Sequence, residues 1–218
     1  MRDSFMTRPW ADALRAEVGP EAPRGFTVPW ERPESELGLV LPTDYKEFVY
    51  VFGPGELDGF VTVAVPGVAN PNVDLVTWAR DTMENHRYLV EEERIVEEGL
   101  ADWPYPPAPQ PGFLLPWGMT ANGDRLHWAT GGDPDGWTVV AEDNGSFELF
   151  PFPGGMAEFL TRFLRDELEI PFLPESEPGQ PVTFVPWDGS WEDEDAAEPY
   201  GTFRPPGSRP DGEESSPG

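Results

Sequence analysis

Four side chains that could perform chemistry lie close together in the stretch GDRLHWATGGDPDGWTVV. They are Asp124, His127, Asp133 and Asp135, residue types that serve as general acids and bases and as metal ligands. Asp124 and His127 are an odd number of residues apart, so on a strand they point to opposite faces. The sequence therefore does not predict that these groups act on one substrate or one ion.

The segment Asp133–Gly136 has the composition of a structural turn. Aspartate, proline and glycine each favour a turn position, and the Asp-x-Asp-Gly order matches a calcium-binding loop only incompletely. No glycine-rich phosphate loop, dinucleotide-binding fingerprint or nucleophile elbow occurs in the chain. We therefore interpret the segment as a turn, and we expect no metal, no cofactor and no catalytic residues.

The residues on either side of this turn predict two strands of an antiparallel meander. Leu126 and Trp128 alternate with polar neighbours, so we expect both to face the core, and we expect His127 to point outward without a partner. Trp137–Ala141 reads as the second strand, with Trp137 in the core. Asn144-Gly145 predicts a tight hairpin into the following FELFPF.

Helices are predicted on both sides of the meander from the spacing of apolar residues. A glycine at position 53 marks the end of one of them, and Asn72 or Asp74 is the expected cap of another. A strand is expected to begin at Phe60, and EAPRGFTVPWERPESE is interpreted as a linker or irregular wrap. The helical segments are Trp10–Val18, Thr43–Phe52, a long one after Asn72, and Met156–Leu168.

These elements predict an α+β fold, in which a mixed, largely antiparallel sheet is packed by helices within a single domain. We divide the chain into residues 1–36, an N-terminal helix with a proline-rich lead-in, residues 37–173, the α+β domain, and residues 174–218, an acidic tail. The tail is rich in Pro, Gly and Ser, so we expect it to be mostly disordered, with its aromatic clusters docking locally.

The charge of the chain limits its partners. Fourteen basic and 41 acidic residues give a formal charge of -27. This charge opposes binding to nucleic acids and to anionic membranes and favours basic protein partners. The chain has no cysteine, no secretory leader pattern and no long apolar run, so we expect a cytoplasmic protein.

The histidines and tryptophans outside the meander have structural interpretations as well. His86 falls on the inward side of the long helix, where packing is the simpler role. Four tryptophans in proline-rich loops are harder to place in a core, and if exposed together they would mark a contact surface. These are Trp103, Trp117, Trp187 and Trp191.

Three motifs in order resemble the SUKH superfamily, which includes the fungal cell-wall-synthesis regulator and many bacterial immunity proteins. They are LPTDYKEFVYVFGPGELDGF, GDRLHWATGGDPDGWTVV and FELFPFPGGMAEFLTRFL, which together cover about Leu37 to Leu168. The resemblance implies a single α+β domain without enzymatic activity that binds a protein, in bacteria mostly a toxin and often a nuclease.

The working hypothesis is an immunity protein that neutralises a basic, nuclease-type toxin by direct contact. Asp133, Asp135, Glu142 and Asp143, on the turns beside the Trp137 strand, are the candidate partner-binding residues. One alternative is a regulatory scaffold that recruits partners through its tail segment VTFVPWDGSW. A more remote alternative is a hydrolase that uses Asp124 and His127.

Overall fold

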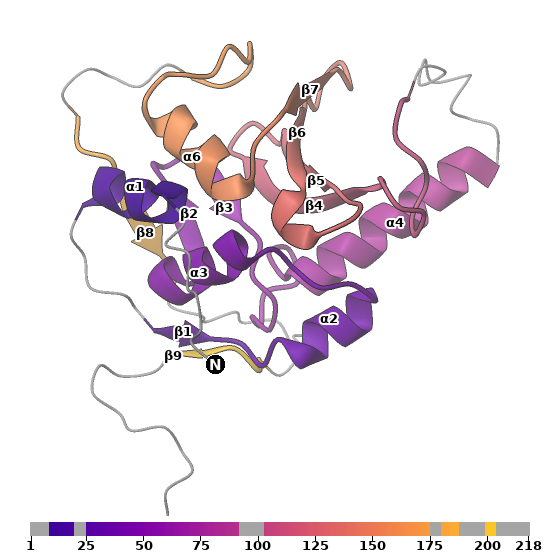
Figure 1. Cartoon of the computed structure of the whole chain (residues 1–218), viewed down its shortest axis with the longest axis horizontal. Helices are drawn as coiled ribbons and strands as arrows, with labels where there is room; N and C mark the ends of the chain where they lie inside the picture. The colour runs from indigo at the N-terminus through magenta and orange to yellow at the C-terminus, as the bar shows by residue number, and fades with distance from the viewer. Residues whose placement is uncertain (1–8, 20–24, 92–102, 175–179, 188–198, 204–218) are drawn as a thin grey trace, which may run out of the picture.

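A seven-stranded sheet forms the centre of the molecule in the computed structural model, which describes residues 9–19, 25–91, 103–174, 180–187 and 199–203 (Figure 1). Its strand order is β7-β6-β5-β4-β3-β2-β8, and every neighbouring pair is antiparallel. The predicted α+β class is confirmed, and within these ranges the sheet has no parallel pair. The strands are β2 (Gly55–Leu57), β3 (Val61–Val63), β4 (Leu114–Thr120), β5 (Arg125–Ala129), β6 (Thr138–Glu142), β7 (Leu149–Phe152) and β8 (Phe184–Pro186).

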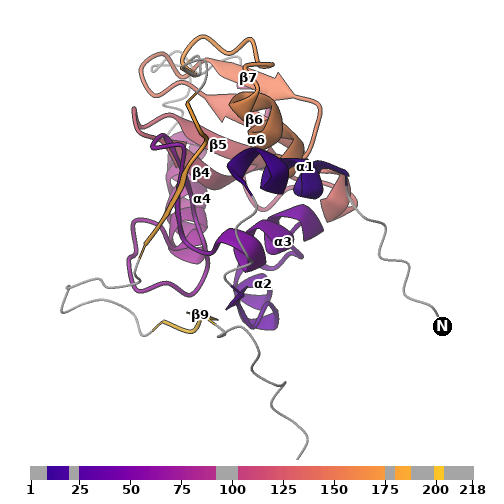
Figure 2. The same cartoon turned by 90° about the vertical axis from the view of Figure 1, so that its left-hand side faces the viewer.

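Helices cover both faces of this sheet (Figure 2). On one face, α1 (Pro9–Val18) packs against α3 (Thr43–Phe52) and α6 (Met156–Leu164), and α6 lies over β6. On the other face, α4 (Leu75–Glu91) packs on β4. Because the sheet is sandwiched, side chains of both strand faces are withdrawn from water, which the alternating pattern of β5 did not indicate.

The helix α3 has the bounds that its sequence predicts. Tyr45, Phe48 and Phe52 lie on its buried stripe, and Gly53 ends it with a φ of 68°. A left-handed residue at this position is favourable only for glycine, since a Cβ would clash with the backbone. The hydroxyl of Tyr45, fully buried, donates to the carbonyl oxygen of Ala64 at 2.6 Å, which ties the helix to the strand layer.

Aspartates from neighbouring elements cap two helices. Asp135 accepts a hydrogen bond from the backbone N–H of Thr43 at 2.7 Å, at the start of α3. Asp44, in the first turn of α3, in turn accepts from the N–H of Ala157 at 3.1 Å, in the first turn of α6. The first amides of a helix lack partners within the helix, so each carboxylate satisfies one of them and interacts favourably with the helix dipole.

Local capping operates at α4. The N–H of Thr77 donates to Asp74 Oδ1 at 2.8 Å, so of the two caps considered from the sequence Asp74 is the one used. Leu75 and Ala79 of the predicted inward stripe are fully buried.

The proline-rich lead-in contains two regular elements, which the prediction of an irregular wrap missed. They are β1 (Phe26–Thr27) and α2 (Glu31–Leu37). Pro33 lies in the first turn of α2, where a proline removes no helical hydrogen bond. A helix of seven residues is also too short to show a clear apolar period, so its sequence resembled a linker.

Two segments after residue 173 dock on the domain, as expected for their aromatic clusters. Strand β8 extends the sheet beside β2, and β9 (Thr202–Phe203) pairs with β1. The ring of Phe184 in β8 packs edge-on against Phe48 and at a tilt against Phe52, with ring centroids 6.2 and 5.2 Å apart, respectively. The predicted disorder elsewhere in the tail concerns residues 175–179, 188–198 and 204–218, which lie outside the described residues.

One apolar core unites the segments that the sequence separated. Leu14 from α1 and Phe26 from the lead-in are buried in the same cluster as Trp128 and Phe159, and Phe184 packs against it. Within the described ranges, no helix combines the length and apolar character needed to cross a bilayer.

Candidate functional site

The turn between β5 and β6 presents two of the four predicted partner-binding carboxylates. It forms a short 3₁₀ helix, η1 (Pro134–Gly136), in which Asp133 accepts from the N–H of Asp135 at 3.1 Å. Asp135 also accepts from the N–H and hydroxyl of Thr43 at 2.7 and 3.2 Å. The prediction of a structural turn is confirmed, and both aspartates remain exposed while they hold this geometry.

The turn between β6 and β7 carries Asp143. Its Oδ1 accepts from the N–H groups of Gly145 and Ser146 at 2.8 and 2.6 Å and from the Ser146 hydroxyl at 2.9 Å. These bonds, chiefly those from Ser146, favour the carboxylate and lower the pKa of Asp143 below its ordinary value. The hairpin predicted at Asn144-Gly145 exists, but residues 143–148 form a longer loop than the tight turn expected.

The two acidic turns lie at opposite ends of β6. This strand has five residues, so its first and last Cα atoms are about 14 Å apart along the strand direction. The structure thus groups Asp133 with Asp135, and it places Asp143 at a separate position. A standard interface buries about 800 Å² per partner, which is wide enough to cover both turns at once.

The fourth candidate, Glu142, is inside the molecule. Its side chain is 5% exposed, and its Oε2 lies 2.7 Å from Nε2 of His127, whose side chain is fully buried. The expectation that His127 points outward without a partner is wrong. The reason is that α4 packs on β4 on this face of the sheet, so the side of β5 that carries His127 is also withdrawn from water.

Asp124 and His127 take part in separate contacts. The buried carboxylate of Asp124 accepts from the hydroxyl of Thr120 at 2.6 Å and from the N–H of Asn144 at 3.1 Å. Asp124 therefore links the β4–β5 turn to the β6–β7 turn. The structure shows no bond that would join it to the imidazole of His127 within the described residues.

The tryptophans of the meander fill the core. Trp128 and Trp137 are buried as predicted, and Trp117, which the sequence left as a possible surface residue, is also fully buried. The ring of Trp117 packs at a tilt against Trp128 and edge-on against Phe159 of α6. The side chains of His86 and Trp191 lie outside the described part of the structure, so the predictions for them are open.

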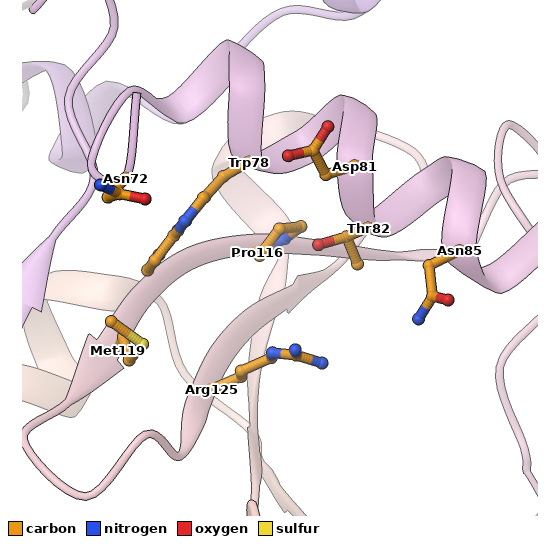
Figure 3. A pocket seen from close by; sticks show the side chains of 8 residues that line it. All are labelled: Asn72, Trp78, Asp81, Thr82, Asn85, Pro116, Met119 and Arg125. Carbon is orange, nitrogen blue, oxygen red and sulfur yellow. The ribbon is translucent and has the colours of Figure 1, made fainter. Parts of the chain in front are cut away.

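A pocket of about 380 Å³, which no sequence pattern indicated, lies between α4 and the sheet (Figure 3). The side chain of Trp78 points toward Met119, and Pro116 lies between Trp78 and Thr82. Asn85 and Arg125 approach from α4 and β5 on the other side. The complete lining is Asn72, Trp78, Asp81, Thr82, Asn85, Pro116, Met119 and Arg125.

The buried pair lies next to this pocket. Arg125 and His127 point to the same face of β5, and His127 pairs in register with Pro116 of the pocket wall. Nη1 of Arg125 is 4.0 Å from Oε1 of Glu142, so one buried carboxylate faces both basic side chains. Glu142 therefore offsets the charge of Arg125 from beneath the pocket.

Comparison of the chain with protein-family models, with curated proteins and with solved structures gave no match. Among the described residues, no group of three or more His, Cys, Asp or Glu side chains is arranged to hold a metal ion.

Proposed function

We propose that this chain is a cytoplasmic protein-binding module of the SUKH type, which neutralises a basic, nuclease-type toxin by direct contact. The observation that carries the proposal is the charge of -27, combined with exposed aspartates that are already fixed in position. The order of the three sequence motifs supports the family, and the α+β fold is compatible with it.

The turns suit such a contact because their carboxylates need little ordering on binding. Asp133, Asp135 and Asp143 are each held by backbone N–H groups, so less side-chain entropy is lost when a partner arrives. A nuclease presents cationic groups to its phosphate substrate, and an acidic protein can occupy the same surface. Glu142 is left out of the proposed contact because it is buried and engaged by His127.

The test uses the basic partner recovered from the native host or encoded beside this gene. The variants are Asp133→Asn with Asp135→Asn, and separately Asp143→Asn. Asparagine removes the charge but keeps the oxygen that the backbone N–H groups need. Calorimetry at low and high salt should show weaker binding for each variant at low salt, with a smaller difference at high salt.

Asp12→Asn is the matched control, because Asp12 is an exposed residue of α1 and its substitution changes the net charge by the same amount as Asp143→Asn. Partner affinity that is independent of salt would contradict the acidic-contact mechanism. Affinities equal to that of the Asp12 variant would contradict the assignment to the turns.

The regulatory scaffold is the competing proposal, and β8 bears on it. Val185 at the outer edge of the sheet is 54% exposed, so part of VTFVPWDGSW is accessible even when docked. Removing everything after Leu173 would also remove β8 and β9 from the fold. A substitution such as Val185→Lys is the better test, since a scaffold that recruits through this segment should lose its partner and an immunity domain should not.

A further inference from the structure

The pocket beneath α4 combines features that suit a cation rather than an anion. Trp78, Asp81, Thr82 and Asn85 occur at helical spacing along the side of α4 that borders the pocket, where Trp78 and Thr82 are half-buried and Asp81 and Asn85 are exposed (Figure 3). The stripe of α4 that is buried against the sheet is apolar and includes Leu75 and Ala79. The polar side chains of Asp81, Thr82 and Asn85 are therefore accessible to a ligand at the edge between α4 and the sheet.

The hydrogen-bonding groups of this face are unused. In the ranges that the structure describes, the side chains of Asp81, Thr82 and Asn85 form no hydrogen bond and no ion pair. All three offer acceptor oxygens, and only asparagine and threonine can also donate. The polar groups of α4 therefore favour a ligand rich in N–H donors.

The charges that line the pocket also favour a cationic ligand. The pocket contains one formal anion, Asp81, and one formal cation, Arg125. Glu142 lies against Arg125 at 4.0 Å, whereas Asp81 has no cation beside it in the described structure. Arg80, the basic neighbour of Asp81 on α4, is directed to Glu36 of α2 at 2.9 Å. The uncompensated charge in the pocket is thus negative.

The apolar part of the lining determines which cation fits. The indole of Trp78 provides an aromatic face, and Pro116 and Met119 provide an apolar wall. A guanidinium stacks on aromatic faces and presents a planar set of N–H donors, whereas an ammonium is a compact and strongly hydrated charge. The aliphatic stem of an arginine can also lie along apolar surface.

We propose that this pocket receives an arginine side chain of the protein partner, with Trp78 stacking on the guanidinium and Asp81 accepting its N–H groups. The proposal rests on the proposed function in so far as the arginine belongs to that partner. It adds a second contact, on α4, to the acidic turns at the ends of β6.

The pocket chemistry can be tested without the partner. N-acetyl-arginine amide is titrated into the full chain and followed by the ¹H–¹⁵N signals of the Trp78 indole and the Asn85 amide. N-acetyl-citrulline amide has nearly the same shape without the charge, and N-acetyl-aspartate amide represents an anion that would bind Arg125. The arginine probe should shift both signals and bind about fivefold more tightly than the citrulline probe.

Asp81→Asn should remove this preference, while Asp12→Asn on the other side of the sheet should keep it. Asp81 is exposed and without a described partner, so its substitution leaves the fold intact. The proposal is overturned if the arginine probe leaves both signals unchanged, if citrulline binds equally well, or if only the aspartate probe binds.

The partner supplies the second measurement. Asp81→Asn should weaken partner binding about fivefold more than Asp12→Asn does, and equal affinities of the two variants would contradict the pocket's role in the complex. If no basic protein binds the chain at all, the proposed function fails, whereas the probe titration still decides whether the pocket accepts a guanidinium.

Discussion

Nε2 of His127 and Oε2 of Glu142 lie 2.7 Å apart on adjacent strands of a sheet that is covered on both faces. Both side chains are withdrawn from water. Glu142 also faces Arg125, whereas Nδ1 of His127 has no hydrogen-bond partner among the described residues, so the imidazole depends on Glu142 for its polar contact. Removing one member of such a pair leaves the other buried without its partner, and this costs more than the pair itself contributes.

Glu142→Leu should therefore lower the free energy of unfolding by about 3 kcal/mol. The double variant His127→Leu/Glu142→Leu should be more stable than Glu142→Leu alone, because it leaves no unpaired imidazole. Urea denaturation measures both. Glu148→Leu, an exposed control on the next turn, should stay within about 0.5 kcal/mol of the parent protein. A Glu142→Leu variant as stable as the control would contradict the structural role of the pair.

Asp135 should contribute to stability through α3, whatever it contributes to binding. Asp135→Ala leaves the N–H of Thr43 without its carboxylate and should cost about 1 kcal/mol. Asp135→Asn keeps an acceptor oxygen, so its loss of stability should be less than half of the loss caused by Asp135→Ala. Thermal unfolding of the two variants separates the capping role from the charge, and equal losses would argue that the bond to Thr43 is unimportant.

Gly55→Ala should detach β8 from the sheet. A Cβ at residue 55 would lie 2.5 Å from the carbonyl oxygen of Val185 and 2.6 Å from the ring of Phe184. The amides of Trp187 and Asp58 bond across this junction, to Pro54 and Thr183, and should exchange with solvent at least about tenfold faster.

Gly136→Ala is the control for this change, because a Cβ there meets no atom within 4 Å and the residue has no positive φ. It should leave both exchange rates as they are. Unchanged protection in the Gly55 variant would mean that β8 can shift to accommodate a methyl group.

Tyr200 should make the docking of the last described segment sensitive to alkaline pH. Burial, together with the charges of Asp74 and Glu36, raises the pKa of Tyr200 from 10.0 to about 12. A raised pKa means that the folded state resists ionisation, so the contribution is complete below pH 10 and is lost as the pH rises from 10 through 12.

The phenolate absorbance of the parent protein minus that of Tyr200→Phe isolates this titration from that of Tyr45, whose pKa is also raised by burial. A difference curve centred near pH 10 would show that Tyr200 is not held in its site. The site itself consists of Gly67, where a Cβ would clash with the ring, and Arg32, 4.1 Å from the ring centre.

Side-chain spacing and turn chemistry predicted those features of the fold that depend on residues close together in the sequence. The bounds of α3, the inward positions of Leu126 and Trp128, and the turn at Asp133 follow from side-chain spacing and turn chemistry. The burial of His127 could not be predicted from side-chain spacing, because nothing in the sequence of β5 indicates that a helix from elsewhere in the chain packs on that face of the sheet. The pocket was missed for the same reason, since its walls come from elements that are far apart in the sequence.

The resemblance and the charge together guided the choice of candidate residues, but only the structure separated them by position. Glu142 and Asp143 are neighbours in sequence, yet the side chain of Glu142 is 5% exposed, whereas Asp143 is only half-buried and lies on the β6–β7 turn. Alternation along a strand predicts that they differ in direction. It does not predict which of the two directions leads to solvent.

The carboxylates that cap α3 and α6 come from distant parts of the chain: Asp135 is 92 residues from Thr43, and Asp44 is 113 residues from Ala157. Each helix therefore has a backbone N–H in its first turn whose acceptor is supplied by another part of the chain. Each end becomes satisfied only when the meander, α3 and α6 have come together, so the two helices should gain stability in one step with the sheet. A fragment that contains α3 without the β5–β6 turn should accordingly be much less helical than the same residues in the whole protein.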